Sequence, residues 1–367
     1  MSKPTRVLHV FGRLDTGGAE SRTMDIYRTI DRERVQFDFA IHTEDDCFYT
    51  KEIELMGGRI YSFPRFSGKN YFNYKNAWTS FFSEHPEYNI IHGHQTSTGF
   101  IYLKEAKKFG VTKRIAHARN SNKDSLIKKY TTMLAKKYAT DLLAVSRLAA
   151  VSEFGEKLTG GGYVKVLPNA IDVNKYAFNF TTRLEKRAEF NLTDDFAIVH
   201  VGRFHPQKNH TLLLEIFKEI QTKVKGAKLF LIGDGPLKED ILNRIEDLGI
   251  QDSVKLLGIR SDVPEILQAM DVLLFPSLFE GLPGVVLEAQ AAGLPCVISS
   301  TITEEVRISD NVSFVSLTDG NQTWANKVVS FLEVIDRDTA YRKIINAGYD
   351  VGSVTKYYQN KLYGKKK

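Results

Sequence analysis

Cysteine is scarce in the 367-residue sequence, which contains only Cys47 and Cys296. Two cysteines imply no disulfide framework, so we expect a reducing, cytoplasmic compartment. Long apolar runs are also missing, because no stretch approaches the roughly 18 residues that span a bilayer. No signal peptide is visible ahead of the first apolar segment at residues 6–11. We therefore expect a cytoplasmic protein without a membrane-spanning helix.

Two further patterns are absent. The sequence has no G-x-G-x-x-G dinucleotide fingerprint, and no His/Cys cluster has the spacing of metal ligands. The sole D-x-D, Asp336-Arg337-Asp338, continues a helical pattern that begins at Val328. A metal-binding D-x-D would end a buried strand, so we expect these two aspartates to be solvated and predict no metal site.

Charge is unevenly distributed along the chain. Residues 1–170 carry a formal charge of +8, and the remainder carries −2. A basic half could face nucleic acid, but no recognition motif accompanies it, and we predict no nucleic-acid partner. An anionic lipid surface or a diphosphate-bearing acceptor explains the charge equally well.

Apolar runs alternate with helical patterns in both halves of the chain, which is long enough for two domains. Strands are expected at residues 6–11, 37–42, 59–63 and 272–275, and helices at 21–30, 211–223 and 285–292. This alternation predicts the α/β class, with two Rossmann-like doubly wound domains facing each other across a cleft.

The most informative stretch runs from Asp271 to Gly293 and reads as a buried strand, a loop and a helix. The helix N-terminus at the carboxyl end of a strand favours an anion. Two carboxylates, Glu280 and Glu288, flank this turn and could accept hydrogen bonds from sugar hydroxyls. The alternative is that both are solvated charges at the helix ends.

The second half contains another candidate site after its first strand. Gly202 and Arg203 follow this strand, and Lys208 lies five residues further on. A planar guanidinium and an ammonium suit a diphosphate, although a chance pair of surface cations would look the same. In the first half, Gly17 and Gly18 open a helix after the first strand and would let a ligand approach the backbone, unless they only form a tight turn.

Four motifs together resemble the retaining nucleotide-sugar glycosyltransferases of family four, the glycosyl transferases group 1, which have the GT-B fold. They are G-G-A-E at residues 17–20, P-N-A-I-D at 168–172, G-R-F-H-P-Q-K-N at 202–209 and E-G-L-P-G-V-V-L-E at 280–288. The resemblance extends over nearly the whole chain and includes bacterial capsular and exopolysaccharide enzymes. Ala170 stands where the family usually has glycine, which affects only a local turn.

The resemblance implies a division into domains. Residues 1–170 would form the acceptor-side domain and residues 171–345 the nucleotide-sugar domain. Residues 346–367 would form a helix that returns to the first domain, followed by a basic tail.

The resemblance also implies roles for individual residues. His94 falls on the active-site histidine, and Glu280, Arg203 and Lys208 would act with it on the reacting sugar and diphosphate. Glu288 would bind the ribose. The implied donor-binding set is Gly17, Gly18, Gly202, Arg203, Lys208, Gly233, Ile259, Arg260, Glu280, Gly281, Leu282, Pro283 and Glu288. We expect His117, Arg119 and Asn120, which end another strand, on the acceptor side.

The expected activity is transfer of a hexosyl unit from a nucleoside diphosphate sugar, UDP-linked, to a carbohydrate acceptor. It would proceed with retention and without a metal or other cofactor, in bacterial surface polysaccharide synthesis. Two alternatives stay open: a nucleotide-sugar epimerase or hydrolase of the same fold, and a non-catalytic partner subunit. The donor sugar, the acceptor, the linkage and the oligomeric state do not follow from the sequence.

The segment from Lys104 to Lys137 is strongly basic, with eleven Lys or Arg residues against Glu105 and Asp124. Its helix also carries an apolar stripe that includes Tyr130 and Met133, for which we favour a core-facing position. The charges could hold the protein at the anionic inner face of the cell membrane, where a lipid-linked oligosaccharide acceptor would be met.

Overall fold

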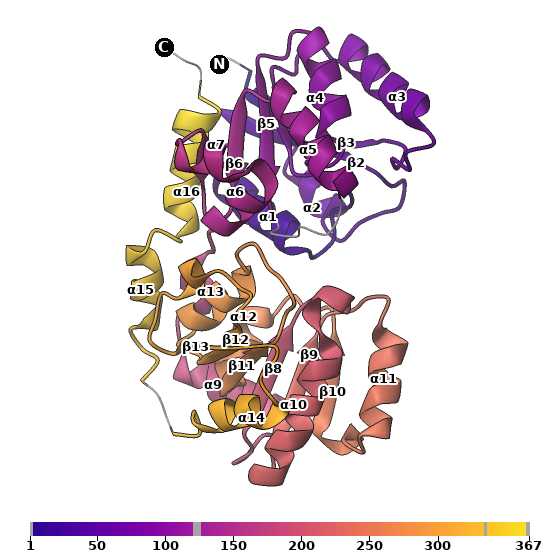
Figure 1. The fold of residues 1–367 in the computed structure, drawn as a ribbon. Coiled ribbons are helices and arrows are strands. Elements are labelled where there is room, and N and C mark those ends of the chain that lie inside the picture. Colours follow the sequence, from indigo (N-terminus) through magenta and orange to yellow (C-terminus); the bar gives the residue numbers. More distant parts are fainter. Residues whose placement is uncertain (1–2, 120–125, 334–335, 365–367) are drawn as a thin grey trace. The chain divides into compact units, whose positions relative to one another are not determined.

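The structure, a computed structural model, describes residues 3–119, 126–333 and 336–364 and divides into two compact units (Figure 1). Unit 1 consists of Met1–Asn169 and Val351–Lys367, and unit 2 consists of Ala170–Asp350. The C-terminal segment therefore packs with the first half of the chain, while residues 346–350, which we had expected in this segment, belong to unit 2.

Unit 1 contains a seven-stranded parallel sheet in the order β3-β2-β1-β4-β5-β6-β7. The strands are β1 (Thr5–Val10), β2 (Val35–Ile41), β3 (Ile60–Ser62), β4 (Ile90–Gly93), β5 (Lys113–Ala118), β6 (Asp141–Ala144) and β7 (Val164–Val166). The helices are α1 (Gly18–Thr29), α2 (Thr50–Leu55), α3 (Tyr71–Glu84), α4 (Gly99–Lys108), α5 (Leu126–Tyr138), α6 (Arg147–Phe154), α7 (Glu156–Gly160) and α16 (Val351–Tyr357), which a π-helical turn, η4 (Tyr358–Leu362), extends.

The strand order of unit 1 determines which helices share a face. Because parallel crossovers are right-handed, α1 and α2 lie on one face of the sheet, and α3, α4 and α5 lie on the other. Helices α3, α4 and α5 pack in a row, and α16 packs against α1.

Unit 2 contains a six-stranded parallel sheet in the order β10-β9-β8-β11-β12-β13. The strands are β8 (Ala197–Val201), β9 (Lys228–Ile232), β10 (Val254–Gly258), β11 (Val272–Phe275), β12 (Cys296–Ser299) and β13 (Val312–Val315). The helices are α8 (Val173–Tyr176), α9 (Phe180–Glu189), α10 (His210–Lys223), α11 (Lys238–Asp247), α12 (Val263–Ala269), α13 (Gly284–Ala291), α14 (Asn321–Val329) and α15 (Ala340–Asn346), with short 3-10 turns η1 (Pro206–Lys208), η2 (Gln251–Ser253) and η3 (Glu304–Val306).

Each sheet reverses its strand order once, which creates a topological switch point. The reversal lies between β1 and β4 in unit 1 and between β8 and β11 in unit 2. In doubly wound sheets, ligands bind beyond the carboxyl ends of the strands at this point. The two α/β units confirm the predicted fold class, and no helix in the described ranges is long and apolar enough to cross a membrane.

The helix expected to run into the D-x-D is not formed. Helix α14 ends at Val329, and residues 336–339 are not helical, although Asp336 and Asp338 are exposed as expected. The buried Arg337 between them donates to the backbone carbonyls of Leu267, Met270 and Ala292 at 2.7–3.0 Å. Arg337 thus ties the C-terminal ends of α12 and α13 together. The helical spacing of apolar residues before the D-x-D therefore did not indicate a helix that continues to Asp338.

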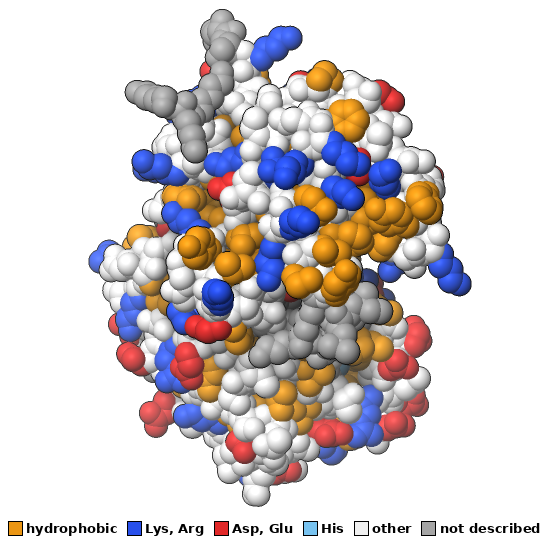
Figure 2. Space-filling view, turned by 45° about the horizontal axis from the view of Figure 1, so that its top comes forward, with side chains coloured by type: hydrophobic (Ala, Val, Ile, Leu, Met, Phe, Trp, Pro, Cys, Tyr) orange, Lys and Arg blue, Asp and Glu red, His pale blue; other side chains and the backbone are white. Residues whose placement is uncertain are grey.

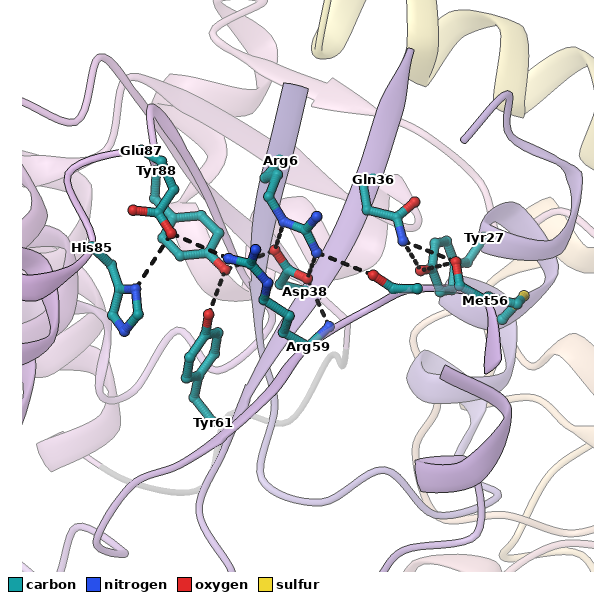
Figure 3. A network of polar contacts seen from close by, with 11 residues as sticks. Arg6, Tyr27, Gln36, Asp38, Met56, Arg59, Tyr61, His85, Glu87 and Tyr88 are labelled. Carbon is teal, nitrogen blue, oxygen red and sulfur yellow. Dashed lines mark hydrogen bonds and ion pairs between the residues drawn. The ribbon is translucent and has the colours of Figure 1, made fainter. Parts of the chain in front are cut away.

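A buried polar network joins the amino end of β1 to the middle of β2 (Figure 3). The carboxylate of Asp38 is inaccessible to solvent and accepts bonds from the Arg6 guanidinium, from the Tyr88 hydroxyl at 2.7 Å and from the Arg59 amide at 2.7 Å. The nearby carboxylate raises the pKa of Arg6, and burial raises that of Tyr88, so both keep their protons at neutral pH. This network is structural.

We predict that Arg6→Met lowers the free energy of unfolding of unit 1 by about 3 kcal/mol, because it leaves a buried carboxylate without its cation. Urea denaturation measures the effect. Arg13→Met is the matched control, since Arg13 pairs with Asp15 and Asp45 at the surface and its loss should have little effect. Equal stabilities of the two variants would contradict the assignment.

Candidate functional site

In unit 2, two loops at the switch point hold Lys208 and Glu280 together. Gln207 links the loops: its side chain donates to the Phe279 carbonyl at 2.9 Å, and its carbonyl accepts from the Leu278 amide at 2.8 Å. The Lys208 ammonium donates to the Glu280 carboxylate at 2.5 Å and lies 4.5 Å from the centroid of the Phe275 ring. Both side chains are mostly buried, so the pair is held in one place.

Two glycines make this arrangement possible. A Cβ at Gly202 would lie 2.9–3.3 Å from the aliphatic carbons of Lys208, so glycine leaves room for the lysine to reach Glu280. Gly233 has a φ of 140° and approaches Gly202 so closely that a Cβ would lie 2.1 Å from the Gly202 carbonyl oxygen. Glycine is the residue that tolerates both constraints. The carboxyl ends of β8 and β9 can therefore approach each other at the site.

Arg203 directly follows Gly202, is exposed and forms no ion pair with any residue that the structure describes. Arg260, also predicted to bind the donor, instead holds both oxygens of Asp262 at 2.6 and 2.7 Å. Ile259 is half exposed. A role of Arg260 in base recognition would therefore use its backbone, while Arg203 keeps its donors for a ligand.

Helix α13 begins directly after the predicted anion-binding turn. Its N-cap residue is Pro283, which has no side chain that could cap the helix. Glu280 and Glu288 are only 7% and 6% exposed, so neither is the solvated helix-end charge of the alternative reading. Gly281, Leu282 and Pro283 are buried between them. Donor binding by these residues stays a prediction that is compatible with their positions.

In unit 1, the corresponding glycine loop follows β1. A Cβ at Gly18 would meet nothing within 4 Å, whereas a Cβ at Gly17 would lie 2.3 Å from the Glu20 carboxylate. Gly17, the N-cap of α1, lets the Glu20 side chain fold back over the start of the helix. Gly18 leaves open space in which a ligand could approach the backbone.

His94 lies just past β4, which borders the switch point of unit 1 on the side opposite β1. Arg119 Nε donates to His94 Nδ1 at 3.0 Å, and His94 Nε2 lies 3.0 Å from His9 Nδ1. Arginine can only donate, so His94 Nδ1 accepts, and its proton sits on Nε2 and is shared with His9. The ring also stacks on Phe11, with centroids 4.1 Å apart. Both ring nitrogens of His94 are therefore occupied in this arrangement.

A second chain of hydrogen bonds reaches His117, which is fully buried. His117 Nδ1 lies 2.9 Å from His92 Nε2, and His92 Nδ1 lies 2.5 Å from the hydroxyl of Tyr363. Burial is the main cause that lowers the pKa values of His92, His94 and His117 well below the ordinary value, so these imidazoles are neutral. The C-terminal segment thus takes part in the histidine cluster.

The nitrogens of His9, His92 and His94 approach within 4.8 Å of one another, close enough to consider a metal. Their rings, however, are stacked: the planes of His92 and His94 make an angle of 17°, and those of His9 and His94 one of 13°. Imidazole lone pairs lie in the ring plane, so nearly parallel rings do not converge on one ion. The Arg119 guanidinium beside them also disfavours a cation.

Sequence reasoning missed some members of this cluster. His9 and His92 were not among the candidate site residues, and the contribution of Tyr363 had no sequence signal. The two histidines are register partners on β1 and β4, and His94 is two residues further along, so all three share one face of the sheet. The alternation of His92 and His94 was the available signal. Asn120 lies outside the described residues.

Three comparisons bear on this arrangement. A family model described as glycosyl transferases group 1 matches residues 195–334. EpsF of Bacillus subtilis (strain 168), a protein named as a glycosyltransferase, is 35% identical over 337 residues, which cover 89% of this chain and 88% of EpsF. The UDP-Gal:alpha-D-GlcNAc-diphosphoundecaprenol alpha-1,3-galactosyltransferase of Escherichia coli is 30% identical over 265 residues, or 69% of this chain and 67% of that enzyme.

The crystal structure of HepE from Anabaena in complex with UDP and glucose has the same fold, with a TM-score of 0.80 at 18% identity. The match covers 97% of this chain and 98% of HepE. Two doubly wound units of this kind form the GT-B fold. The chain belongs to the glycosyl transferases group 1 family.

Proposed function

We propose that this protein transfers a hexosyl unit from a UDP-sugar to a carbohydrate on a lipid-linked acceptor, in bacterial surface polysaccharide synthesis. The observation that carries the proposal is the buried Lys208–Glu280 pair at the switch point of unit 2, together with the exposed Arg203, which forms no ion pair with the described residues. The printed name of the Escherichia coli relative supports the substrate classes, because that enzyme acts on UDP-Gal and a diphosphoundecaprenol-linked sugar.

The proposed chemistry assigns one task to each group. Arg203 and Lys208, with the N-terminus of α13, neutralise the charge that develops on the leaving diphosphate, an electrostatic effect that commonly dominates catalysis. Glu280 binds hydroxyls of the transferred sugar, and Glu288 binds the ribose. If the acceptor hydroxyl attacks the anomeric carbon from the same face that the diphosphate leaves, the anomeric configuration is retained. Because side-chain cations supply the positive charge, we propose that no metal or other cofactor takes part.

We predict that Arg203→Ala weakens UDP binding at least tenfold, because a charge-assisted hydrogen bond contributes about 1.5–3 kcal/mol. Isothermal titration calorimetry measures the affinity. Arg203 suits this test better than Lys208, since removing the lysine would also leave the buried Glu280 carboxylate without its partner. An unchanged UDP affinity would remove Arg203 from the donor site.

The two alternative functions make different predictions. An epimerase or hydrolase would consume the nucleotide sugar without an acceptor, whereas a transferase needs one. A non-catalytic partner subunit would need none of the charged groups in unit 2. The chain has Arg203, Lys208 and Glu280, and two of them form the buried ion pair, which favours an enzyme.

The basic region of unit 1 suggests where the protein meets its acceptor. On α5 the expected core-facing stripe is wrong, because Tyr130 is 59% exposed and Met133 is 51% exposed. Lys107 and Lys137, on the adjacent helices α4 and α5, are also exposed. Figure 2 shows hydrophobic side chains next to Lys and Arg side chains over the upper half of the molecule. We propose that this surface binds the anionic inner face of the cell membrane, where lipid-linked acceptors are found.

We predict that the protein binds anionic vesicles at low salt and is released at high salt, because each exposed cation near an anionic leaflet contributes about 1 kcal/mol and salt screens it. Flotation measures the bound fraction. The combined change Tyr130→Ser, Met133→Ser and Lys137→Ser should weaken binding. Phe180→Ser on α9 of unit 2 is the control, since Phe180 is 63% exposed but lies outside the basic region. Equal binding of both variants would contradict the proposed surface.

A further inference from the structure

Arg119, just past β5, is held by three hydrogen bonds, and each goes to a neutral group. Nε donates to His94 Nδ1 at 3.0 Å, Nη1 to the Asn169 side-chain oxygen at 3.0 Å and Nη2 to the Thr23 hydroxyl at 3.4 Å. These partners come from three separate parts of unit 1, namely β4, the segment after β7, and α1. Arg119 is therefore firmly positioned without being neutralised.

The surroundings of Arg119 supply little negative charge. Among the residues that the structure describes, none forms an ion pair with its guanidinium. His92, His94 and His117 have lowered pKa values, caused chiefly by burial with a contribution from Arg119 itself, so they are neutral neighbours. Burial is the main influence on the pKa of Arg119 and lowers it. The charge of the Glu20 carboxylate raises this pKa, but by less.

A partly buried guanidinium without a counter-charge destabilises the fold unless a bound anion supplies that charge. Arg119 is half-buried, so its guanidinium has lost part of its hydration, and charges withdrawn from water in proteins are normally paired. Its donors are also incompletely used, because guanidinium has five N–H groups and three are engaged. One N–H on Nη1 and one on Nη2 therefore have no acceptor among the described residues. A planar cation with two spare donors matches the oxygens of a phosphoryl group.

We infer that Arg119 binds a phosphoryl group of a substrate, which supplies the counter-charge that no described residue gives Arg119 through an ion pair. This inference rests on the proposed function, because a transferase that acts on nucleotide sugars and diphosphate-linked acceptors handles phosphoryl groups on both substrates. The shared chemistry is a phosphate ester or diphosphate, whichever substrate carries it. His94 is then a positioning residue, whose Nδ1 fixes the orientation of the Arg119 guanidinium.

The test compares wild-type protein with Arg119→Gln and with Arg203→Gln as the matched control. Calorimetry and thermal denaturation are measured with two probes, UDP for the donor diphosphate and α-glucose 1-phosphate for a sugar-linked phosphate. We expect Arg119→Gln to weaken the binding of at least one probe tenfold or more. Without ligand, its melting temperature should equal or exceed that of the wild type, because an uncompensated charge has been removed. Arg119→Lys, which keeps the charge but loses the planar geometry, should bind with intermediate affinity.

The probe that loses affinity identifies the substrate. Loss with α-glucose 1-phosphate alone assigns Arg119 to the acceptor phosphate, and loss with UDP assigns it to the donor. If Arg119→Gln binds both probes as the wild type does, or melts well below it, the inference is wrong and Arg119 is a structural residue. The proposed function fails separately, if wild-type protein does not bind UDP or if Arg203→Gln binds it unchanged.

Discussion

Glu280→Gln is expected to lower the turnover number by on the order of a hundredfold or more while the protein stays folded. Glutamine retains an oxygen that can accept the Lys208 hydrogen bond of 2.5 Å, so the loops at the switch point should keep their positions. The negative charge is lost, however, and with it the strong acceptor for the hydroxyls of the transferred sugar. A large effect is expected because the carboxylate is only 7% exposed and water cannot replace it.

Turnover is measured as release of nucleoside diphosphate at saturating donor, and circular dichroism confirms the fold. Glu288→Gln should act chiefly on nucleotide affinity, since we assign Glu288 to the ribose. Glu239→Gln, an exposed carboxylate in the first turn of α11, is the control and should be fully active. Wild-type rates in both the Glu280 and Glu288 variants would refute the assignment of this pair to the donor.

Lowering the pH from 7.5 to 5.5 is expected to reduce the free energy of unfolding of unit 1 by up to about 7 kcal/mol. His9, His42, His92, His94 and His117 all have folded-state pKa values below the ordinary value, with burial as the main cause. As the pH falls through the unfolded value of about 6.5, the unfolded chain binds protons that the folded unit does not. These neutral histidines therefore stabilise the folded unit fully above pH 6.5, and this stabilisation is lost below it. The change from pH 7.5 to 5.5 removes about 1.4 kcal/mol per histidine.

The two tryptophans of the chain allow each unit to be followed separately. Trp78 is fully buried in unit 1, and Trp324 is fully buried in unit 2. Denaturation of Trp324→Phe would report on unit 1, and that of Trp78→Phe on unit 2, through fluorescence. Unit 2 has fewer buried histidines with lowered pKa values, His200 and His210, and should lose less stability. Equal pH dependence of the two units would contradict the neutral state of the histidine cluster.

The sequence predicted those features that depend on neighbouring residues. Strand β11 was expected at residues 272–275 because four apolar residues follow one another, and it is confirmed there. Helix α13, predicted at residues 285–292, ends at Ala291, and Gly293 follows its C-cap with a φ of +66°. A Cβ at that position would also lie 2.6 Å from the Arg337 side chain. Local periodicity and turn chemistry were therefore sufficient to predict the fold class.

Other features depend on contacts between residues far apart in the chain. The hydrogen bond between His92 and Tyr363 joins residues 271 positions apart, and the Lys208–Glu280 pair joins residues 72 apart. Motif spacing predicted that Lys208 and Glu280 matter but not that they pair. For Tyr130 and Met133, helical periodicity showed an apolar stripe but not whether it is covered, because that depends on where the neighbouring helices lie.

The most direct measurement is release of nucleoside diphosphate from a panel of nucleotide sugars, with purified protein, a chelator, and with or without a diphospholipid-linked sugar acceptor. We predict release from a UDP-hexose that requires the acceptor, persists in the chelator and yields a product with the donor's anomeric configuration. Release without acceptor would indicate an epimerase or hydrolase. Activity abolished by the chelator and restored by Mn²⁺ or Mg²⁺ would refute metal independence, and no release from any nucleotide sugar would contradict the proposed transfer.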